Sequence, residues 1–571
     1  MYALRTDLSI LTCTIDDPIT TLVKGSTLGK QLQSDACMAV ASRWLEECML
    51  QSGLAHKNCP KVTLYLMPSR VINVGPADGS KEPYLQDTKG STGQWVVLSH
   101  CWGSTVAMTT TKATLQLRQE KIPLSALPRS FQDAVVITRK LGFVHLWIDS
   151  LCIIQDSVDD WNVESGFMGH IYSKAVVCIA AEAALNSSLG VFESSRKGTA
   201  ARMVEGRYIS PSTGLSGSLW FQGKSLDNSK SESLLSMGGP LSQRAWTLQE
   251  NFLAPRIIRY GKMQLGWSCR SFRCSEHHPH FREKCDEPKK LFHFAETRES
   301  KELEIIKDYD EMVQLEWILE CWYKFVNEYM ARRLTNEDDR LPAIAGLAKE
   351  IGSRTGHSYR AGLWLEDIHI GLLWSTRGRA KYGGQYAAPS WSWASVSGFD
   401  VAPVYKLEHA NHDLSTEWSA NNISVFYSSK ARVVDIMIEA ATSDSFLKVN
   451  SATLVLFGLV YPFDDLLRAS QPTFQQVSFK RSKKLRGSVT FCELDHHKED
   501  LWTVSDLQNS GIIYLQITKT WHRPGEYEIL WALILEPTDG AANQYRRIGI
   551  AEICPGDSMF KGWTEREIQI V

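Results

Sequence analysis

The chain has 571 residues, with 62 Lys or Arg against 64 Asp or Glu, so the formal net charge is −2 at pH 7. This near-balance argues against a dedicated nucleic-acid-binding protein, because such binding depends on many clustered cationic contacts to phosphates. The apolar fraction of 43% and the charged fraction of 22% are typical of globular proteins and exclude a disordered or fibrous chain. At roughly 150 residues per domain, the length predicts two to four domains.

The cysteines and the hydropathy pattern predict the compartment. Thirteen cysteines are scattered along the chain, and several, such as Cys152 and Cys178, lie in apolar runs where a free thiol packs as a small hydrophobic side chain. The chain does not open on a signal-peptide pattern and has no apolar run of about 18 residues. We therefore expect a reduced, cytoplasmic protein with no membrane span and no nucleic-acid partner.

The first 94 residues are expected to form a lead-in segment of helix and strand that precedes the main α/β domain. Apolar residues recur at three- and four-residue steps in 31–50, as in a helix that is buried on one side. A strand-like stretch follows at 60–74, and the glycines of 76–93 predict a loop.

Strands and helices alternate from Trp95 onward. Periodic apolar residues predict helices over 127–142 and 160–175, and Gly142 is a plausible end of the first. Short, unbroken apolar runs predict buried strands around these helices, at 95–99, 143–148 and 176–181. This order is typical of an α/β fold in which helices flank a parallel sheet.

After residue 240 the pattern changes. A helix is expected over 241–252 and strands in 256–269. A charged stretch over 286–307 is expected to be a solvated helix or an insertion, and 315–349 is expected to be helical. From about residue 406, short apolar runs separated by polar turns predict a β-rich region. We therefore expect four domains, namely a lead-in (1–94), an α/β domain (95–255), a mostly helical region (256–400) and a β-rich accessory domain (401–571).

Polar side chains follow two of the predicted parallel strands. Ser99 ends the first strand, with Trp102 close behind it, and Asp149 follows the second. Ligands bind beyond the carboxyl ends of the strands in open parallel sheets, which makes these residues candidates for a binding site. The alternative is ordinary turn chemistry, because Ser and Asp also bend and cap chains.

Glu164 interrupts the apolar face of the predicted helix 160–175. At about 100° per residue, it shares one stripe with Trp161 and with apolar residues of the following turns. A carboxylate on a buried face is costly unless it is paired, protonated or facing a cavity, so Glu164 is a candidate catalytic or ligand-binding acid. The structural alternative is an ion pair, for instance with Arg129 or Arg139, or a favourable interaction with the helix N-terminus.

Arg244, Trp246 and Glu250 lie together in the predicted helix 241–252. Trp246 and Glu250 are neighbours on one face of such a helix. The Arg and the Glu either form a structural pair or line the same cleft as Glu164, in a second layer around it.

A run of cysteines and histidines after the predicted strands offers competent metal ligands. It lacks the paired C-x2-C clips of common zinc folds, and adjacent histidines in a polar loop are usually solvated. The sequence therefore assigns no metal ligand, and a metal-dependent protein stays the weakest alternative. The residues of this run are Cys269, Cys274, His277, His278, His280 and Cys285.

Several long motifs occur in the order that they have in a known family. They are VVLSHCWGS (96–104), IPLSALPRSFQDAV (122–135), LGFVHLWIDSLCIIQD (141–156), DWNVESGFMGHIYSKA (160–175) and PLSQRAWTLQENFLAPR (240–256). Through them the chain resembles the heterokaryon-incompatibility (HET) domain of filamentous fungi. LTNEDDRLPAIAGLA (334–348), AGLW (361–364) and APSWSWAS (388–395) resemble the segment that often follows this domain, and RRIGIAEI (546–553) is a weaker match. His100 stands where Tyr is more usual, and Gly166 and Gly169 lower the helix propensity near Glu164.

The resemblance implies a role in non-self recognition after cell fusion and in programmed cell death. The family has been related to the Toll/interleukin-receptor (TIR) fold, a flavodoxin-like parallel sheet. Some TIR domains hydrolyse NAD⁺ with the Glu of a W-x-x-E-like segment, which Trp161 and Glu164 match. The resemblance thus implies Glu164 as the catalytic residue, with Ser99, Trp102, Asp149 and Trp161 binding the substrate NAD⁺ and with no cofactor. The alternative is a non-enzymatic adaptor that signals death by self-association or through other incompatibility proteins, with Glu164 in a structural pair.

Overall fold

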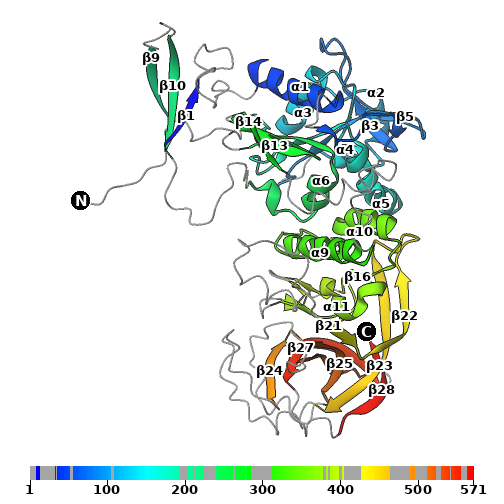
Figure 1. Ribbon diagram of the computed structural model, residues 1–571. Coiled ribbons are helices and arrows are strands. Elements are labelled where there is room, and N and C mark those ends of the chain that lie inside the picture. The colour runs from blue at the N-terminus through cyan, green and yellow to red at the C-terminus, as the bar shows by residue number, and fades with distance from the viewer. Residues whose placement is uncertain are drawn as a thin grey trace. The chain divides into compact units, whose positions relative to one another are not determined.

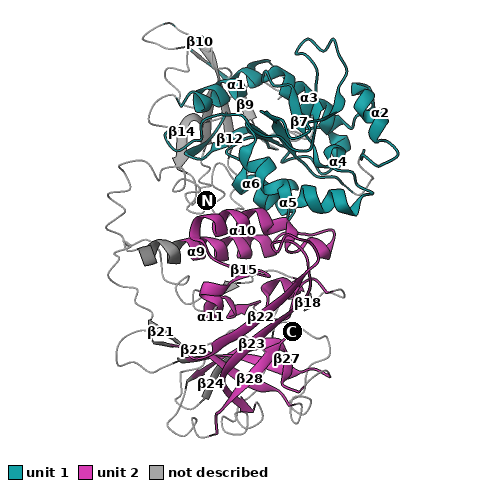
Figure 2. Ribbon diagram, turned by 90° about the vertical axis from the view of Figure 1, so that its right-hand side faces the viewer, with its two compact units in different colours: residues 1–311 teal, residues 312–571 magenta. Residues whose placement is uncertain are grey.

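The computed structural model of the protein describes most of the chain in two compact units, Met1–Glu311 and Met312–Val571 (Figure 2). The charged stretch over 286–307, expected to be a solvated helix or an insertion, lies outside the described residues. The expected division into four domains stays a prediction. The described residues are 8–12, 33, 35–51, 56–103, 108–192, 203–209, 214, 216–223, 239–261, 264–276, 278–284, 311–376, 381–382, 386–397, 402–403, 426–462, 488–494, 511–521, 529–539, 542–554 and 562–571.

A nine-stranded sheet lies at the centre of the first unit (Figure 1). Four of its strands are parallel neighbours, in the order β7, β6, β8, β11, and the strands on both sides of them pair antiparallel. From one edge to the other the strands are β14 (His278–Lys284), β13 (Phe272–Ser275), β12 (Leu265–Cys269), β11 (Arg256–Tyr260), β8 (Val177–Ala180), β6 (Val96–Ser99), β7 (His145–Trp147), β3 (Arg70–Asn73) and β4 (Tyr84–Asp87). Every residue of β6 and β8 is buried, so the prediction of doubly covered parallel strands is confirmed.

Helices flank this sheet, as the apolar periodicity predicts. The stripe of α3 (Arg129–Lys140) buries Phe131, Ala134 and Val135, and Gly142 ends the helix region at a φ of +83°. The side chain of Ser157 caps α5 (Val158–Lys174) by accepting a hydrogen bond from the Asp160 backbone. The other helices of the unit are α1 (Asp35–Met49), α2 (Leu115–Glu120), α4 (Asp149–Cys152) and α6 (Thr247–Leu253).

Smaller elements complete the unit. β1 (Leu8–Thr12), β10 (Ser216–Gly223) and β9 (Met203–Ile209) form a three-stranded antiparallel sheet, and β2 (Tyr65–Leu66) pairs with β5 (Thr92–Gly93). Short 3-10 turns lie at Leu124–Ala126, Ser187–Leu189 and Leu241–Gln243.

The path of the chain creates a switch point between β6 and β8. From β6 the chain turns to β7 on one side, and from β8 it turns to β11 on the other side. Ligand sites of open α/β sheets lie beyond the carboxyl ends of the strands at such a point. The residues that follow β6, β7 and β8 therefore mark the place where a site is expected.

The second unit begins with two helices, α9 (Glu311–Met330) and α10 (Pro342–Thr355). Trp322 on α9 lies edge-on to the rings of Tyr359, Trp364 and Trp393. The prediction of a mostly helical region over 256–400 is wrong in part, because β11 to β14 extend the first sheet and short strands lie between the helices of the second unit and its large sheet. These are β15 (Tyr359–Arg360), β16 (Leu363–Trp364), β17 (Trp374–Ser375), β18 (Lys381–Tyr382), β19 (Val396–Ser397) and β20 (Ala402–Pro403), with the one-turn helices Leu365–Asp367, α11 (Ile368–Gly371) and Trp393–Ser395.

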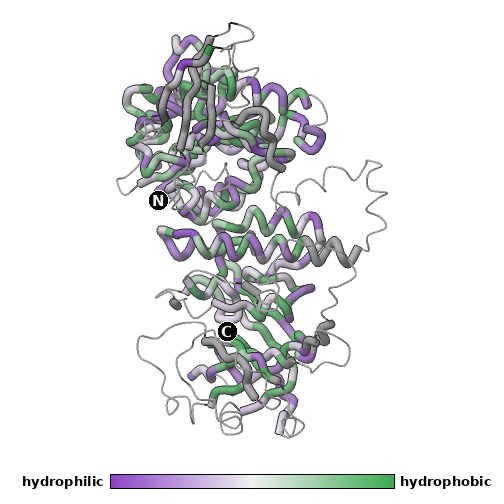
Figure 3. Tube along the Cα trace, turned by 60° about the vertical axis from the view of Figure 1, so that its left-hand side comes forward, coloured by the Kyte–Doolittle hydropathy of each residue, from purple (hydrophilic) through white to green (hydrophobic). Residues whose placement is uncertain are grey.

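An eight-stranded sheet fills the rest of the second unit, so the predicted β-rich C-terminal region is confirmed. β23 pairs with β22, β28 and β25, and the pairings of β25, β26, β27, β28 and β23 close into a ring. Its strands carry long apolar stretches, green in Figure 3, whose buried side chains include Leu530, Ile534 and Ile553. The strands are β21 (Phe426–Ser429), β22 (Arg432–Ala440), β23 (Val449–Pro462), β24 (Ser488–Leu494), β25 (Ile513–Trp521), β26 (Ile529–Pro537), β27 (Gln544–Cys554) and β28 (Thr564–Ile570).

Buried Arg547 connects two parts of this unit that are distant in sequence. Its guanidinium donates to the carbonyl oxygens of Leu372 at 2.6 Å and Trp374 at 2.5 Å, and it lies over the Trp374 ring. Its backbone N–H donates to Ser390 Oγ, in the APSWSWAS segment.

Among the residues that the structure describes, no helix is long and apolar enough to cross a bilayer.

Candidate functional site

Ser99, at the end of β6, forms a buried pair with Glu250 of α6. The Ser99 hydroxyl donates to Glu250 Oε2, and the two residues are only 4% and 6% exposed. The pKa of Glu250 is raised to about 7, mainly by burial and also by the Asp149 carboxylate, while Ser99, Arg244 and Tyr172 act in the opposite direction. A carboxyl group that titrates near neutral pH is suited to proton transfer, although Ser99 itself is engaged.

Asp149, which follows β7, fixes the loop after β6. Its Oδ2 accepts a hydrogen bond from Trp102 Nε1 at 2.8 Å, and its Oδ1 lies 3.8 Å from His100 Nδ1. Burial lowers the pKa of His100 to about 4, so near neutral pH the contact joins a neutral imidazole to a carboxylate and is not an ion pair. Arg244 Nη1 donates to the His100 carbonyl oxygen at 2.6 Å, which holds the same loop from the other side.

Glu164 of α5 faces inward, as its place in the apolar stripe predicts, and is 1% exposed. Its Oε1 lies 3.8 Å from Arg70 Nη2, while Oε2 is buried without a hydrogen-bond partner among the described residues. Burial raises the pKa of Glu164, the Asp160 carboxylate adds to the rise, and Ser69 and Arg70 oppose it. An orphaned buried oxygen is unusual and calls for an explanation.

The cation that contacts Glu164 is Arg70 of β3, which is not among the two arginines named as examples from the sequence. Arg139 instead donates to the carbonyl oxygens of Val74 and Lys81. Arg70 is mainly engaged elsewhere, because its Nη2 donates to both carboxylate oxygens of Asp160 at 2.7 and 2.6 Å. Its Nε donates to the carbonyl oxygen of Cys152. Arg70 thus gives Glu164 a weak, long contact.

Trp161 and Trp246 meet at the contact between α5 and α6. Their ring centroids are 6.5 Å apart with an interplanar angle of 88°, an edge-to-face pair in which each ring stays half-buried. The predicted site residues therefore fall into small groups at one edge of the sheet: Ser99 with Glu250, Trp102 with Asp149, and Trp161 with Trp246. Glu164 hydrogen-bonds to none of them. Its carboxylate and that of Asp149 both act on the buried Cys152, whose pKa is raised to about 12, mainly by burial.

Sequence reasoning missed two charged residues of this edge, Arg70 and Glu182. Glu182 follows β8 and pairs with Arg259 of β11, with Nη1 and Oε1 2.6 Å apart. The signal for Glu182 was present, because the rule that selects Ser99 and Asp149 also selects a polar residue after the third strand. Nothing local marks Arg70, which reaches the site only because β3 pairs with β7.

The structure describes the side chains of only two residues of the Cys and His run, Cys269 and Cys274. Cys269 lies beside Cys48, His56 and Cys59. Cys274 is buried on β13 and is not a member of that group. His277 and Cys285 lie outside the described residues, as do the side chains of His278 and His280.

Residues 95–250 match the family model described as "Heterokaryon incompatibility protein (HET)". Residues 95–250 are a HET domain. The search of curated proteins and the search of solved structures each found no match. The resemblance seen in the motifs is thus confirmed, and the family's description connects the chain with heterokaryon incompatibility.

The limits of the HET domain include most of the edge residues but not all. β6, β7, β8 and both candidate carboxyl groups, Glu164 and Glu250, lie within 95–250. Arg70 precedes the domain and Arg259 follows it. The guanidinium groups that contact Glu164 and Glu182 thus come from strands outside the HET domain, in the same sheet.

Proposed function

We propose that the HET domain of this protein hydrolyses the bond between nicotinamide and ribose in NAD⁺, and so acts in fungal non-self recognition and programmed cell death. Glu164 carries the proposal. It combines nearly complete burial, a raised pKa and one carboxylate oxygen without a partner in the described part of the chain. Such a group is a functional-site candidate on physical grounds alone. It also occupies the Glu position of the W-x-x-E-like segment.

The strand order supports the proposed relation to TIR and flavodoxin-like folds. Numbered along the chain, the parallel strands β7, β6, β8 and β11 stand in the order 2-1-3-4. Flavodoxin-like sheets begin with this order and bind their ligand at the switch point between strands 1 and 3. The next strand departs from that fold, because β12 pairs antiparallel with β11.

The proposed reaction needs few groups. The glycosidic bond breaks with its electron pair passing to the nicotinamide nitrogen, and water adds to the ribose carbon and releases a proton. An ionised Glu164 would stabilise the oxocarbenium-like transition state, as carboxylates do in glycoside hydrolysis. The half-buried Trp102, Asp149 and Trp161 are placed to contact substrate, while the buried Ser99 orients Glu250. Because Glu164 is 1% exposed, substrate binding must displace side chains that cover it.

The test compares Glu164→Gln with wild type on the full chain. We expect the rate of nicotinamide release from NAD⁺ to fall at least about 100-fold in Glu164→Gln, because transition-state charge stabilisation is lost. Killing of cells that express the variant should be lost as well. Asp159→Asn is the matched control, since it removes a carboxylate from the same helix at an exposed position. Equal rates for Glu164→Gln and wild type would refute the assignment.

The contact with Arg70 favours a second function, that of a non-enzymatic adaptor. Arg70, Asp160 and Glu164 form a charged group that joins β3 to α5, as a purely structural network would. In that case death signalling proceeds by self-association or through other incompatibility proteins, and NAD⁺ is not consumed. Wild-type protein that releases no nicotinamide at any concentration, yet still kills cells, selects the adaptor. Location in the cytoplasm stays a prediction under both functions.

A further inference from the structure

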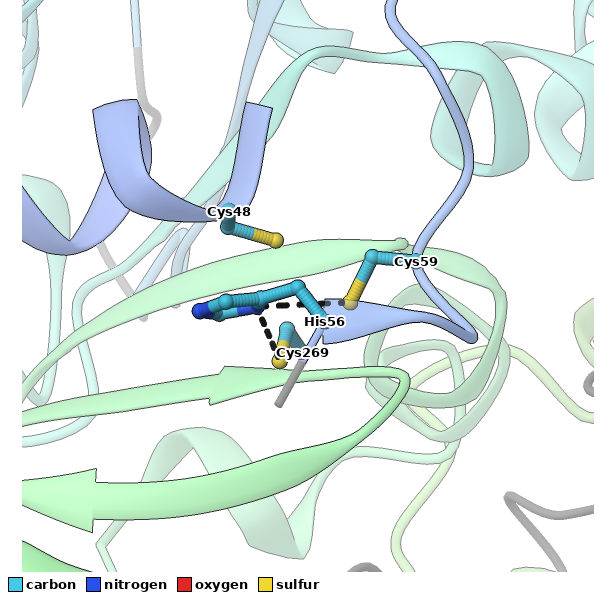
Figure 4. Close-up of side chains that lie close together, drawn as sticks. All are labelled: Cys48, His56, Cys59 and Cys269. Atoms are coloured by element: carbon cyan, nitrogen blue, oxygen red, sulfur yellow. Dashed lines mark hydrogen bonds between the residues drawn. The ribbon is translucent and has the colours of Figure 1, made fainter. Parts of the chain in front are cut away.

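Four buried side chains from three segments converge beside β12, outside the HET domain. Cys48 comes from the last turn of α1, His56 and Cys59 from the segment after it, and Cys269 from the end of β12. Their ligand atoms all lie within 4.8 Å of one another, and Figure 4 shows the three sulfurs gathered around the imidazole. His56 Nδ1 is 3.7 Å from Cys59 Sγ and 3.9 Å from Cys269 Sγ.

The two separations from His56 Nδ1 are close to those of a tetrahedral metal site, and the widest separation in the group, up to 4.8 Å, would contract by about 1 Å around an ion. With metal–sulfur bonds of about 2.3 Å and metal–nitrogen bonds of about 2.0 Å, neighbouring ligand atoms of a tetrahedron lie about 3.5–3.8 Å apart. Three thiols and one imidazole form a soft donor set that suits zinc, and Cys₃His is a usual combination in structural zinc sites. We propose that Cys48, His56, Cys59 and Cys269 bind one structural zinc ion.

The charge of Arg256 supports this proposal independently. Arg256 is 1% exposed, and its Nε lies 3.2 Å from Cys48 Sγ. Its other donors go to the carbonyl oxygens of Val176 and Pro60, and within the described ranges it has no carboxylate partner. A buried guanidinium without a counter-charge is strongly unfavourable. Three thiolates, one neutral imidazole and Zn²⁺ carry a net charge of −1, which balances it.

A second contact also fits zinc-bound thiolates. Ser271 Oγ lies 3.4 Å from Cys59 Sγ, within reach for the hydroxyl to donate to a thiolate. Such contacts around the ligands orient them and tune the metal. The competing arrangement is a disulfide, but the cysteines of the group are free thiols, and bridging two of them would leave the third buried beside His56.

The location of the group indicates a structural role. Cys269 pairs with Arg256, the first residue of β11, so the group lies at the amino ends of the parallel strands. The candidate hydrolase site lies at their carboxyl ends. Four protein ligands complete a tetrahedral shell and leave no open position for a substrate. The ion would tie α1 and the 56–59 segment to β12.

The decisive experiment measures metal in the full-length protein. We expect about one zinc per chain after purification and, once the zinc is removed with a chelator, the intense visible bands of tetrahedral thiolate-bound Co²⁺ on titration with cobalt. Zinc below about a tenth of an equivalent, together with no such bands, would overturn the proposal. So would a disulfide among Cys48, Cys59 and Cys269 in the freshly purified protein, found by mass spectrometry without reduction.

A pair of variants separates zinc ligands from other buried cysteines. Cys59→Ser should lower zinc affinity by more than about 100-fold, since even changes beyond the ligands commonly lower it 10- to 100-fold. Cys274→Ser is the control, because Cys274 is buried on the neighbouring β13 outside the group, and it should retain one zinc. Wild-type affinity in Cys59→Ser would contradict the assignment. If Cys59→Ser fails to fold, the cobalt titration of wild type still shows whether the thiolates bind a metal.

Discussion

Glu164 and Glu250 are both buried carboxyl groups on helices beside the same sheet edge, yet their surroundings differ. Glu250 accepts a hydrogen bond from Ser99 and lies in the field of Asp149 and Arg244. Glu164 has an orphaned oxygen and a long contact to Arg70. A satisfied carboxyl group and an unsatisfied one give different expectations, because the first acts mainly on stability and the second is available to a ligand.

The ionisation of Glu250 should make stability depend on pH. The pKa of Glu250 is raised from 4.5 to about 7 in the folded protein, so its favourable contribution is complete below pH 4.5 and is lost as the pH rises through 7. Glu250→Gln removes this titration and keeps an acceptor for Ser99. Between pH 5 and pH 8, wild type should lose roughly 3 kcal/mol of unfolding free energy relative to Glu250→Gln. Urea denaturation of both proteins at the two pH values measures the difference.

A difference between the two proteins that does not change with pH would show that the Glu250 carboxyl has the same pKa in the folded and the unfolded protein. Because both chains keep every other titratable group, the comparison isolates one side chain.

The loop after β6 depends on Gly103, whose φ is +88°. A Cβ at this position would collide with Asn186 Cβ, next to the 3-10 turn that follows β8. Gly142, at the end of α3, has a φ of +83°, but a Cβ there would point into open space, with no atom of the described residues within 4 Å. The two glycines therefore share the backbone requirement and differ in the space around them.

Replacing each glycine by alanine should separate the cost of left-handed backbone from the cost of a steric clash with Asn186. Gly142→Ala should lower the unfolding free energy by about 1 kcal/mol, the cost of left-handed backbone for an L-residue. Gly103→Ala should lower it by about 2–3 kcal/mol, because a clash adds to that cost. Thermal denaturation followed by circular dichroism checks both. Equal losses would mean that Asn186 moves aside freely.

At the scale of the element, the sequence predicts helices and buried strands well, because both depend on residues that are close together in the chain. The periodicity of 127–142 and the unbroken apolar runs of β6 and β8 predict α3 and the buried strands, because a 3.6-residue stripe and burial on both faces are local signatures. The inward direction of Glu164 follows from the same periodicity. Its partner Arg70 does not, since β3 reaches it only through strand pairing.

The same distinction explains the Cys and His residues. In the sequence, Cys269 is noticeable because other cysteines and histidines follow it closely. In the structure it lies beside Cys48, His56 and Cys59, which are more than two hundred positions away. The spacing Cys48-x7-His56-x2-Cys59 was the available signal, and it is incomplete without the fourth ligand, which only the pairing of β11 with β12 places.

On the scale of the whole molecule, each of the two units has its own buried core, and Arg547 is a central contact of the second. Arg547→Met should lower the unfolding free energy of that unit by about 3 kcal/mol, because the carbonyl oxygens of Leu372 and Trp374 lose their donors. Arg546→Met, which removes an exposed pair with Glu536, should change it by less than about 1 kcal/mol. Differential scanning calorimetry of the full chain measures both.

A similar effect of the two Arg variants would show that the buried guanidinium contributes no more than a surface ion pair. Nicotinamide release and zinc content should stay at wild-type values in Arg547→Met, because both proposed sites lie in the first unit.

The sheet of the first unit imposes an order on biosynthesis. Cys269 follows Cys59 by 210 positions, so at the usual speed of translation the ribosome needs about 10 to 40 s to deliver the last member of the group. During that interval two thiols and an imidazole of the nascent chain are open to oxidation, to stray metals and to chaperones. α1, which carries Cys48, can therefore pack against β12 only late in translation, after the segment with Cys269 has left the ribosome.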